Sequence, residues 1–128
     1  MRKARKSLEA TADRLWQDCI RLVYNERCAL CGYMAPGGAG HHIIKRRRKA
    51  TRWAVLNGIF LCPTHHRQAE EKPKWFLDWL AGTMPDVFRW VETHKRDEYH
   101  GMTADIEATV DLLRQLKKTL EGVKNGTR

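Results

Sequence analysis

The chain has 128 residues, of which 42% are hydrophobic and 30% are charged, and its formal net charge is +9 at pH 7. A chain of this length has the size of one domain, with a small hydrophobic core and little stability to spare. No stretch is long and apolar enough to cross a bilayer or to act as a secretory signal, so the sequence excludes an integral membrane protein and predicts a cytoplasmic one.

The positive charge is concentrated in two basic strips that contain no acidic residue. The first strip is Arg2, Lys3, Arg5 and Lys6, and the second is Lys45, Arg46, Arg47, Arg48, Lys49 and Arg52. These are ten of the 24 lysines and arginines, and the other 14 are balanced by 15 acidic residues. Polyanions bind such strips by phosphate neutralisation and counterion release, which indicates a nucleic acid as partner. A solvated face or a localisation signal is the alternative.

An apolar pattern near the beginning of the chain predicts a helix over residues 7–24. Apolar side chains recur three and four residues apart, as they do on one face of an amphipathic helix. They are Leu8, Ala12, Leu15, Cys19, Leu22 and Val23. Cys19 lies on this face, so we interpret it as a core residue.

Two short strands are predicted in the middle of the chain, over residues 42–44 and 58–61. Both are apolar runs, and the long basic loop between them indicates a hairpin with an oversized connection. Thr64 is the predicted N-cap of a helix that runs to about residue 72. Pro73 could end that helix or begin the next element.

The C-terminal part, residues 73–122, is predicted to be a helical extension. Its first two helices carry aromatic and aliphatic side chains that we expect in the core, namely Trp75, Phe76, Trp79 and Leu80, then Phe88, Trp90 and Val91 after Pro85. Trp90 could alternatively be a stacking surface. A last helix over residues 103–120 has one apolar face, formed by Ile106, Val110, Leu113, Leu116 and Leu120. That face could be structural or could form a homodimer.

Four residues have the spacing of a structural zinc site. Cys28 and Cys31 are separated by two residues, so both thiolates can reach one ion, and Gly32 gives the turn its conformational freedom. Cys62 and His65 repeat this spacing, which completes a tetrahedral Cys3His set without an open position. A redox pair of Cys28 and Cys31 is the alternative. Such a pair does not need the second half-site, so the zinc interpretation is preferred.

A second group of polar residues lies between and beside the zinc ligands. Adjacent residues of a strand point to opposite faces, so His41 and His42 should have different roles. If one of them binds a metal ion, its neighbour can face a phosphate and activate water as general base. His66 is about 100° around a helix from His65 and can face the strand. Two imidazoles leave open positions on an ion, as in a catalytic site.

Each of these residues also has an ordinary structural interpretation. His41, His42 and His66 could be core histidines with satisfied hydrogen bonds. Asn57 precedes a glycine, and this dipeptide is typical of a turn, so Asn57 could have no part in catalysis.

Together, these residues resemble the zinc-bearing branch of the HNH endonucleases. The resemblance extends over residues 27–70 and is carried by His41-His42, Asn57 and His66, set within Cys-x2-Cys and Cys-x2-His. Within the family, the Leu15-Trp16 pair of the first helix and residues 49–53 are similar to phage recombination nucleases of the NinG type.

The resemblance implies an α+β fold with a ββα-metal (treble-clef-like) core, structural zinc, and flanking N-terminal and C-terminal helices. It also implies that His42 is the general base, that His41 and His66 hold one divalent catalytic ion, and that Asn57 pins the loop that orients His42. The activity it implies is hydrolysis of DNA phosphodiester bonds with 5′-phosphate and 3′-hydroxyl products. A site that occurs once favours nicking.

The sequence departs from the family pattern at two positions. His41 stands where other members carry Asp, and a neutral imidazole makes Mn²⁺, Co²⁺ or Ni²⁺ acceptable beside Mg²⁺. Glu70 stands where some relatives carry a further His, one helical turn after His66. It could reach the ion directly or through water, or it could be a solvated charge on the helix.

The basic loop, residues 45–52, is predicted to bind the DNA backbone next to the ion, since arginines bind phosphates in bidentate fashion. No array of base-reading side chains is evident, so we expect low sequence specificity. The main alternative is a non-catalytic zinc-containing module that binds nucleic acid. Such a module would not need the set of His41, His42, Asn57 and His66.

Overall fold

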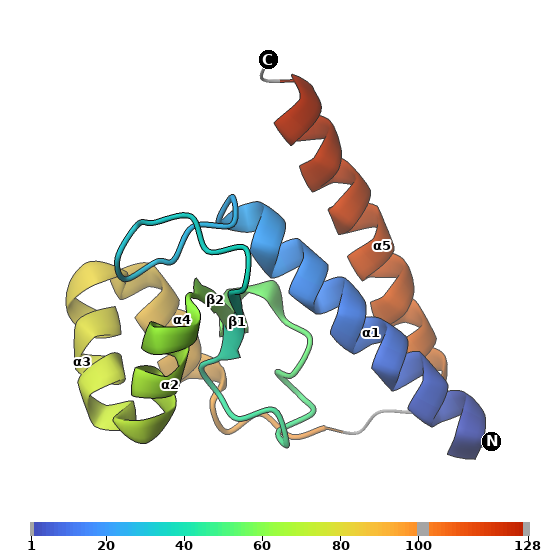
Figure 1. Cartoon of the computed structure of the whole chain (residues 1–128). Helices are drawn as coiled ribbons and strands as arrows, with labels where there is room; N and C mark the ends of the chain where they lie inside the picture. Colours follow the sequence, from blue (N-terminus) through green and yellow to red (C-terminus); the bar gives the residue numbers. More distant parts are fainter. Residues whose placement is uncertain (1, 100–102, 127–128) are drawn as a thin grey trace.

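The computed structural model of the protein describes residues 2–99 and 103–126, and the side chains of residues 4–99 and 105–124. Arg2 and Lys3 of the first basic strip therefore have side chains outside this part. The elements, in chain order, are α1 (Arg2–Val23), β1 (Ala39–His42), a 3-10 turn η1 (Val55–Asn57), β2 (Gly58–Leu61), α2 (Pro63–Glu71), α3 (Pro73–Thr83), α4 (Pro85–His94) and α5 (Thr103–Gly126). Figure 1 shows the hairpin between α1 on one side and α2, α3 and α4 on the other.

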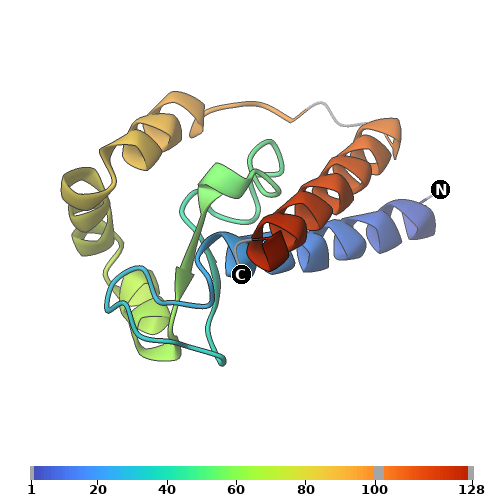
Figure 2. The same cartoon turned by 90° about the horizontal axis from the view of Figure 1, so that it is seen from above.

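Helix α1 is the long element against which both the hairpin and α5 pack. It begins at Arg2, earlier than the predicted residue 7. The two long helices α1 and α5 lie side by side in both views (Figures 1 and 2). Ile106, Val110 and Leu113 of α5 are buried in the same cluster as Ala12 and Cys19 of α1. The apolar face of α5 thus packs against α1 within the chain. Of the two roles predicted for this face, structural packing and dimer formation, the structure shows the first.

The buried face of α1 is wider than the predicted stripe. Trp16 is 1% exposed and Ile20 is fully buried, although neither belongs to that stripe, whereas Val23 is 42% exposed. The reason is that α1 is covered on two sides, by α5 and by the hairpin. Gly58 makes the close approach to the hairpin possible, because a Cβ atom there would lie 2.4 Å from Ile20 Cδ1 and 2.6 Å from Trp16 Cζ2.

The sheet is an antiparallel pair in which His41 is opposite Ile59 and His42 is opposite Gly58. The second predicted strand, residues 58–61, is correct. The first was predicted over residues 42–44 and instead ends at His42. The chain leaves the sheet there because the backbone amide of Ile44 donates to the side chain of Asn57, at 2.7 Å, and not to the neighbouring strand.

Three short helices, each with Pro in its first turn, follow the hairpin. The N-cap of α2 is Cys62 and not the predicted Thr64, since Cys62 Sγ accepts a hydrogen bond from the amide of His65. Phe76 of α3 packs in the core under β2 with Ile59. Trp75 was also expected in the core, but it points outward and is 39% exposed.

The architecture is therefore α+β, with five α-helices and a two-stranded sheet among the described residues. A hairpin followed directly by a helix, with cysteines at its base, is the predicted ββα-metal arrangement. None of the described helices has the length and apolar character needed to cross a membrane.

Candidate active site

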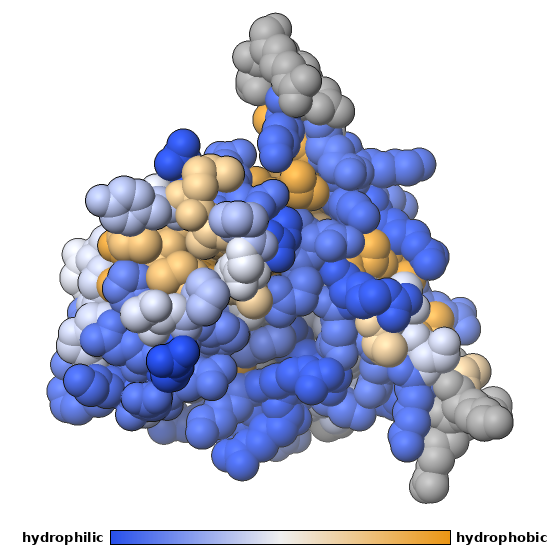
Figure 3. Space-filling view, in the orientation of Figure 1, coloured by the Kyte–Doolittle hydropathy of each residue, from blue (hydrophilic) through white to orange (hydrophobic). Residues whose placement is uncertain are grey.

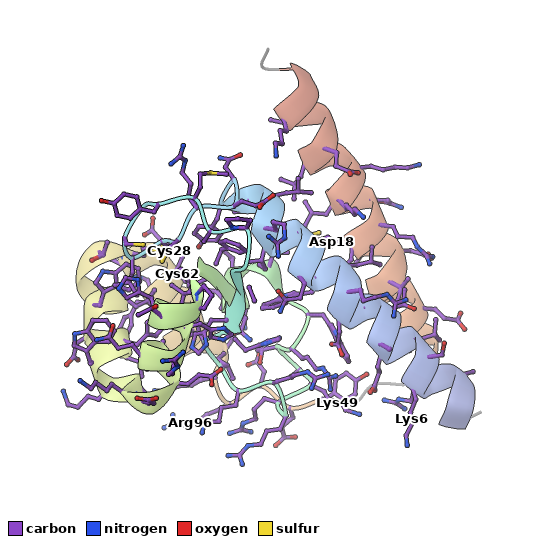
Figure 4. All side chains as sticks on the ribbon, in the orientation of Figure 1. Lys6, Asp18, Cys28, Lys49, Cys62 and Arg96 are labelled. Carbon is purple, nitrogen blue, oxygen red and sulfur yellow. The ribbon has the colours of Figure 1, made fainter. Side chains whose placement is uncertain are left out.

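The four predicted zinc ligands meet at the base of the hairpin and the start of α2. One ligand atom each from Cys28, Cys31, Cys62 and His65 lies within 4.8 Å of all the others. His65 Nδ1 is 3.5 Å from Cys28 Sγ and 3.3 Å from Cys62 Sγ. A tetrahedral zinc ion with ordinary bond lengths places sulfur and nitrogen ligands about 3.6 Å apart. The cluster can therefore hold a zinc ion. Cys28 and Cys62 are labelled in Figure 4.

The protonation of Cys28 also suits a metal. Burial raises the pKa of Cys28, but the backbone amides of Cys62, Cys31 and Leu30 and the ring of His65 outweigh burial and bring this pKa down to about 6. A thiolate, the form that binds zinc, is therefore available near neutral pH. The turn that brings Cys31 back to Cys28 contains Gly32 with a φ of +76°, a conformation that glycine adopts without strain.

A second group of possible ligands consists of His41, His66 and Glu70, whose ligand atoms all lie within 4.8 Å of one another. The rings of His41 and His66 are 5.2 Å apart and nearly perpendicular. His66 Nε2 is 3.1 Å from Glu70 Oε1, one helical turn further along α2. Glu70, which the sequence left open as a ligand or a solvated charge, thus lies beside both imidazoles.

His41 is held in its neutral form. Its pKa is lowered to about 4, mainly by burial and further by the proximity of His66 and His42. Its ring and that of Phe76 form a T-shaped pair, with the ring centres 5.1 Å apart. A neutral imidazole keeps a lone pair available, as a metal ligand must.

His42 points to the opposite side of the strand, toward α1. Its ring stacks on that of Trp16, with centres 3.9 Å apart and an angle of 8° between the planes. Nε2 lies 2.9 Å from the carbonyl oxygen of Arg52. A carbonyl can only accept, so Nε2 carries the proton and Nδ1 keeps the lone pair. The pKa of His42 is lowered, chiefly by burial, which favours the neutral ring.

Asn57 is fully buried and makes three hydrogen bonds to the loop after β1. Its Oδ1 accepts from the amide of Ile44, at 2.7 Å. Its Nδ2 donates to the carbonyl oxygens of Ile44 and Thr51, both at 3.1 Å. Asn57 therefore links the beginning of the basic loop to its end. This role is larger than that of a residue that only forms a turn.

Three of the six basic side chains predicted to contact nucleic acid are held by acidic residues of α1. Arg52 makes a bidentate pair with Asp13, with its Nη2 2.6 Å and its Nε 3.0 Å from the two carboxylate oxygens, and only 12% of its side chain is exposed. Arg46 also pairs with Asp13, at 2.8 Å, and Lys49 pairs with Glu9, at 2.9 Å. No sequence pattern indicated that these acids reach the basic loop.

The remaining three basic side chains of the loop are exposed. Lys45, Arg47 and Arg48 make no side-chain hydrogen bond or ion pair to any part of the chain that the structure describes. The loop lies along the lower edge of the molecule in Figure 1, and this face is hydrophilic in Figure 3. Lys49 is labelled at the same edge in Figure 4. Free positive charge is thus present on this edge.

Both histidine groups open into one cleft of about 640 Å³ between α1, the hairpin and α2. His41, His66 and Glu70 line this cleft, together with His42 and Arg46. A group that can hold a metal ion, an imidazole with a lowered pKa and a positive charge therefore face a common space.

The fold and the two ligand clusters define the class: an α+β protein with a ββα-metal core that can hold zinc. Residues 28–68 match the family model described as HNH endonuclease, which confirms the predicted resemblance for this segment. The segment is less than half of the chain and leaves α1, α3, α4 and α5 outside it. No curated protein and no solved structure matches the chain, and the finer similarity to NinG-type nucleases is not confirmed.

The match gives the coarse functional class. HNH nucleases act on DNA and use divalent metal ions, so the segment supports a nuclease activity for this protein.

Proposed function

We propose that the protein is a metal-dependent DNA endonuclease that hydrolyses phosphodiester bonds with His42 as general base. The observation that supports this most directly is the shared cleft, into which both His42 and the group of His41, His66 and Glu70 open. A purely structural set of histidines would not need to leave a metal-binding group and a neutral base facing the same space.

His41 and His66 would hold a single catalytic divalent ion, with Glu70 as a third ligand. When bound, such an ion stabilises negative charge on the phosphate and on the departing oxygen. Two imidazoles and a carboxylate form a mixed set that suits Mn²⁺ as well as Mg²⁺, with Co²⁺ or Ni²⁺ also acceptable.

His42 removes the proton from the attacking water. Nδ1 takes this proton while Nε2 stays bonded to the carbonyl of Arg52. The water oxygen forms a bond to phosphorus, and the bond from phosphorus to the 3′ oxygen breaks. The products are a 5′-phosphate and a 3′-hydroxyl, whose proton comes from solvent. Asn57 holds the loop that carries this carbonyl.

The exposed Lys45, Arg47 and Arg48 would bind the phosphate backbone of DNA beside the cleft, and Arg46 and Lys49 could contribute where phosphate competes with Asp13 and Glu9. Phosphate contacts position a protein on DNA without reading its sequence, so we infer low sequence specificity. A single site per chain makes nicks, and paired cuts would require a homodimer or successive nicks.

The test is nicking of supercoiled plasmid by the zinc-loaded protein with Mg²⁺ or Mn²⁺, and with EDTA as control. We expect nicked circles only with the ion. His42→Ala should abolish nicking while zinc content and DNA binding stay close to the parent values. Cleavage by this variant at the parent rate would refute the assigned base. DNA binding without cleavage under any ion would instead identify a non-catalytic zinc module.

A further inference from the structure

The ring of His42 is in contact with a helix that lies outside the HNH segment. Trp16 of α1 stacks face to face on the imidazole, with ring centres 3.9 Å apart. The indole is itself fixed, since its Nε1 donates to the carbonyl of Ala54, at 2.8 Å, and only 1% of the residue is exposed. A rigid ring therefore covers one face of the imidazole.

The hydrogen bond of His42 is also supported from α1. The carbonyl that accepts from Nε2 belongs to Arg52. The side chain of Arg52 donates hydrogen bonds to both carboxylate oxygens of Asp13. Asp13 further accepts from Nε1 of Trp53, at 2.8 Å. Asp13 thus fixes two successive residues of the loop at the position where its backbone meets His42.

A third contact holds the strand that carries His42. The side-chain amide of Gln17 pairs with the backbone of Gly40, accepting from its N–H at 2.8 Å and donating to its carbonyl at 3.1 Å. Trp16, Gln17 and Asp13 are near neighbours on one side of α1. Trp16 restrains the ring of His42, Gln17 restrains the strand that carries it, and Asp13 restrains its hydrogen-bond partner Arg52.

We propose that α1 positions the general base, with Trp16 and Asp13 as positioning residues that keep the His42 ring in one orientation and its proton on Nε2. This inference rests on the proposed role of His42. A partial rotation of the imidazole about its Cβ–Cγ bond would break the stack on Trp16, and a half-turn would break the bond to Arg52. A fixed ring keeps Nδ1 directed to one place, and misplacement of a reacting group by about 1 Å costs on the order of 100-fold in rate.

Asp13→Asn in the full, zinc-loaded chain tests the support of Arg52. The amide keeps the size of the carboxylate but loses the charge and one acceptor. We expect kcat for plasmid nicking to fall at least about tenfold, because the orientation of His42 is affected. KM should not rise, because Arg46 is released from Asp13 and stays available to phosphate. The matched control is Asp18→Asn, which also breaks an α1 ion pair, because Asp18 Oδ2 lies 3.0 Å from Nζ of Lys117 in α5. It should leave kcat unchanged.

Trp16 is tested by a pair of variants. Trp16→Phe keeps an aromatic ring beside His42, and Trp16→Leu removes it. We expect Trp16→Phe to retain most of the parent kcat. The kcat of Trp16→Leu should fall by a factor similar to that expected for Asp13→Asn. Trp16 is part of the core, so zinc content and thermal unfolding are measured for both variants. If Trp16→Leu does not fold, Asp13→Asn and Trp16→Phe still test the proposal.

A readout independent of cleavage is the nitrogen NMR spectrum of His42 without DNA. The parent should show the proton on Nε2 alone, and Asp13→Asn should show a mixture of the two tautomers. Unchanged kcat and an unchanged tautomer in Asp13→Asn would overturn the inference even where His42→Ala is inactive. Conversely, if the parent shows no nicking, the proposed function fails, while a tautomer shift in Asp13→Asn would still support the positioning of His42 by α1.

Discussion

The side-chain carbonyl of Asn57 accepts a 2.7 Å hydrogen bond from the backbone amide of Ile44, at the point where β1 ends and the basic loop begins. This bond stands in place of a strand hydrogen bond. Together with the two hydrogen bonds that Asn57 Nδ2 donates, this bond holds the two ends of the basic loop together. The last residue of that loop, Arg52, carries the carbonyl that accepts from His42.

Replacement of Asn57 with Ala should therefore affect both stability and activity. It leaves the amide and the carbonyl of Ile44 without a partner in a buried place, and it removes one of the two hydrogen bonds that the carbonyl of Thr51 accepts. We expect the free energy of unfolding in urea to fall by roughly 3 kcal/mol, since each unsatisfied buried group costs about 1–3 kcal/mol. Gln115→Ala, on the exposed face of α5, is the control and should be neutral. Equal unfolding curves for the two variants would contradict this account of Asn57.

Loss of one zinc ligand should unfold the hairpin. Cys31→Ser removes one of the four ligands of the cluster, and zinc binding in small sites is coupled to folding. We expect the zinc content to fall from one ion per chain to none, and the thermal transition to be lost or strongly lowered. Cys19→Ala is the matched control, because Cys19 is buried between α1 and α5 and lies outside the cluster. A Cys31→Ser protein that keeps zinc would contradict the assignment.

The parts of the site that could be predicted from the sequence are those with local spacing. Cys28 and Cys31, like Cys62 and His65, are close in the chain, so one turn geometry brings each pair together whatever surrounds it. Strand β2 was predictable for the same reason, because it is a short apolar run of four residues. These features require no knowledge of distant packing.

The contribution of α1 could not be predicted because it depends on packing between remote segments. Asp13 and Arg52 are separated by 39 positions and meet only because α1 lies across the hairpin. Hydrophobic spacing located the helix but indicated only one buried face, and so missed Trp16. The end of β1 was misplaced because apolar residues after His42 continue the strand pattern, whereas the side chain of Asn57 accepts from the amide of Ile44.

Glu70 should determine how strongly the catalytic ion is bound. Its carboxylate lies 3.1 Å from His66 Nε2, so Glu70→Gln removes an anionic oxygen from beside the two imidazoles. We expect the Mn²⁺ concentration for half-maximal nicking to rise roughly tenfold, in the range that altered metal surroundings produce. Glu71→Gln changes the same charge one residue further on α2, away from the group, and should behave as the parent. Identical metal dependence of the two variants would assign Glu70 to the solvated surface.

The exposed arginines of the basic loop should contribute to DNA binding through charge alone. Arg47→Ala combined with Arg48→Ala removes two side chains that have no partner in the described part of the chain. Each phosphate contact contributes about 0.9 to the slope of log Kd against log salt, so we expect the slope to fall by nearly two. The loss should be the same for unrelated duplex sequences, because phosphate contacts carry no sequence information.

Two further variants separate this effect from net charge and from folding. Lys74→Ala with Arg89→Ala removes the same charge from α3 and α4, where both side chains are exposed and paired locally, and should leave the slope unchanged. Arg52→Ala should act differently from the loop pair. Because Arg52 is mostly buried against Asp13, its loss should lower the free energy of unfolding, and at low salt it should reduce DNA affinity less than loss of Arg47 and Arg48 does. The basic loop would then have two distinct halves, one that binds phosphate and one that anchors the loop to α1. An equal effect of Arg52→Ala and the double variant on the salt slope would contradict that division.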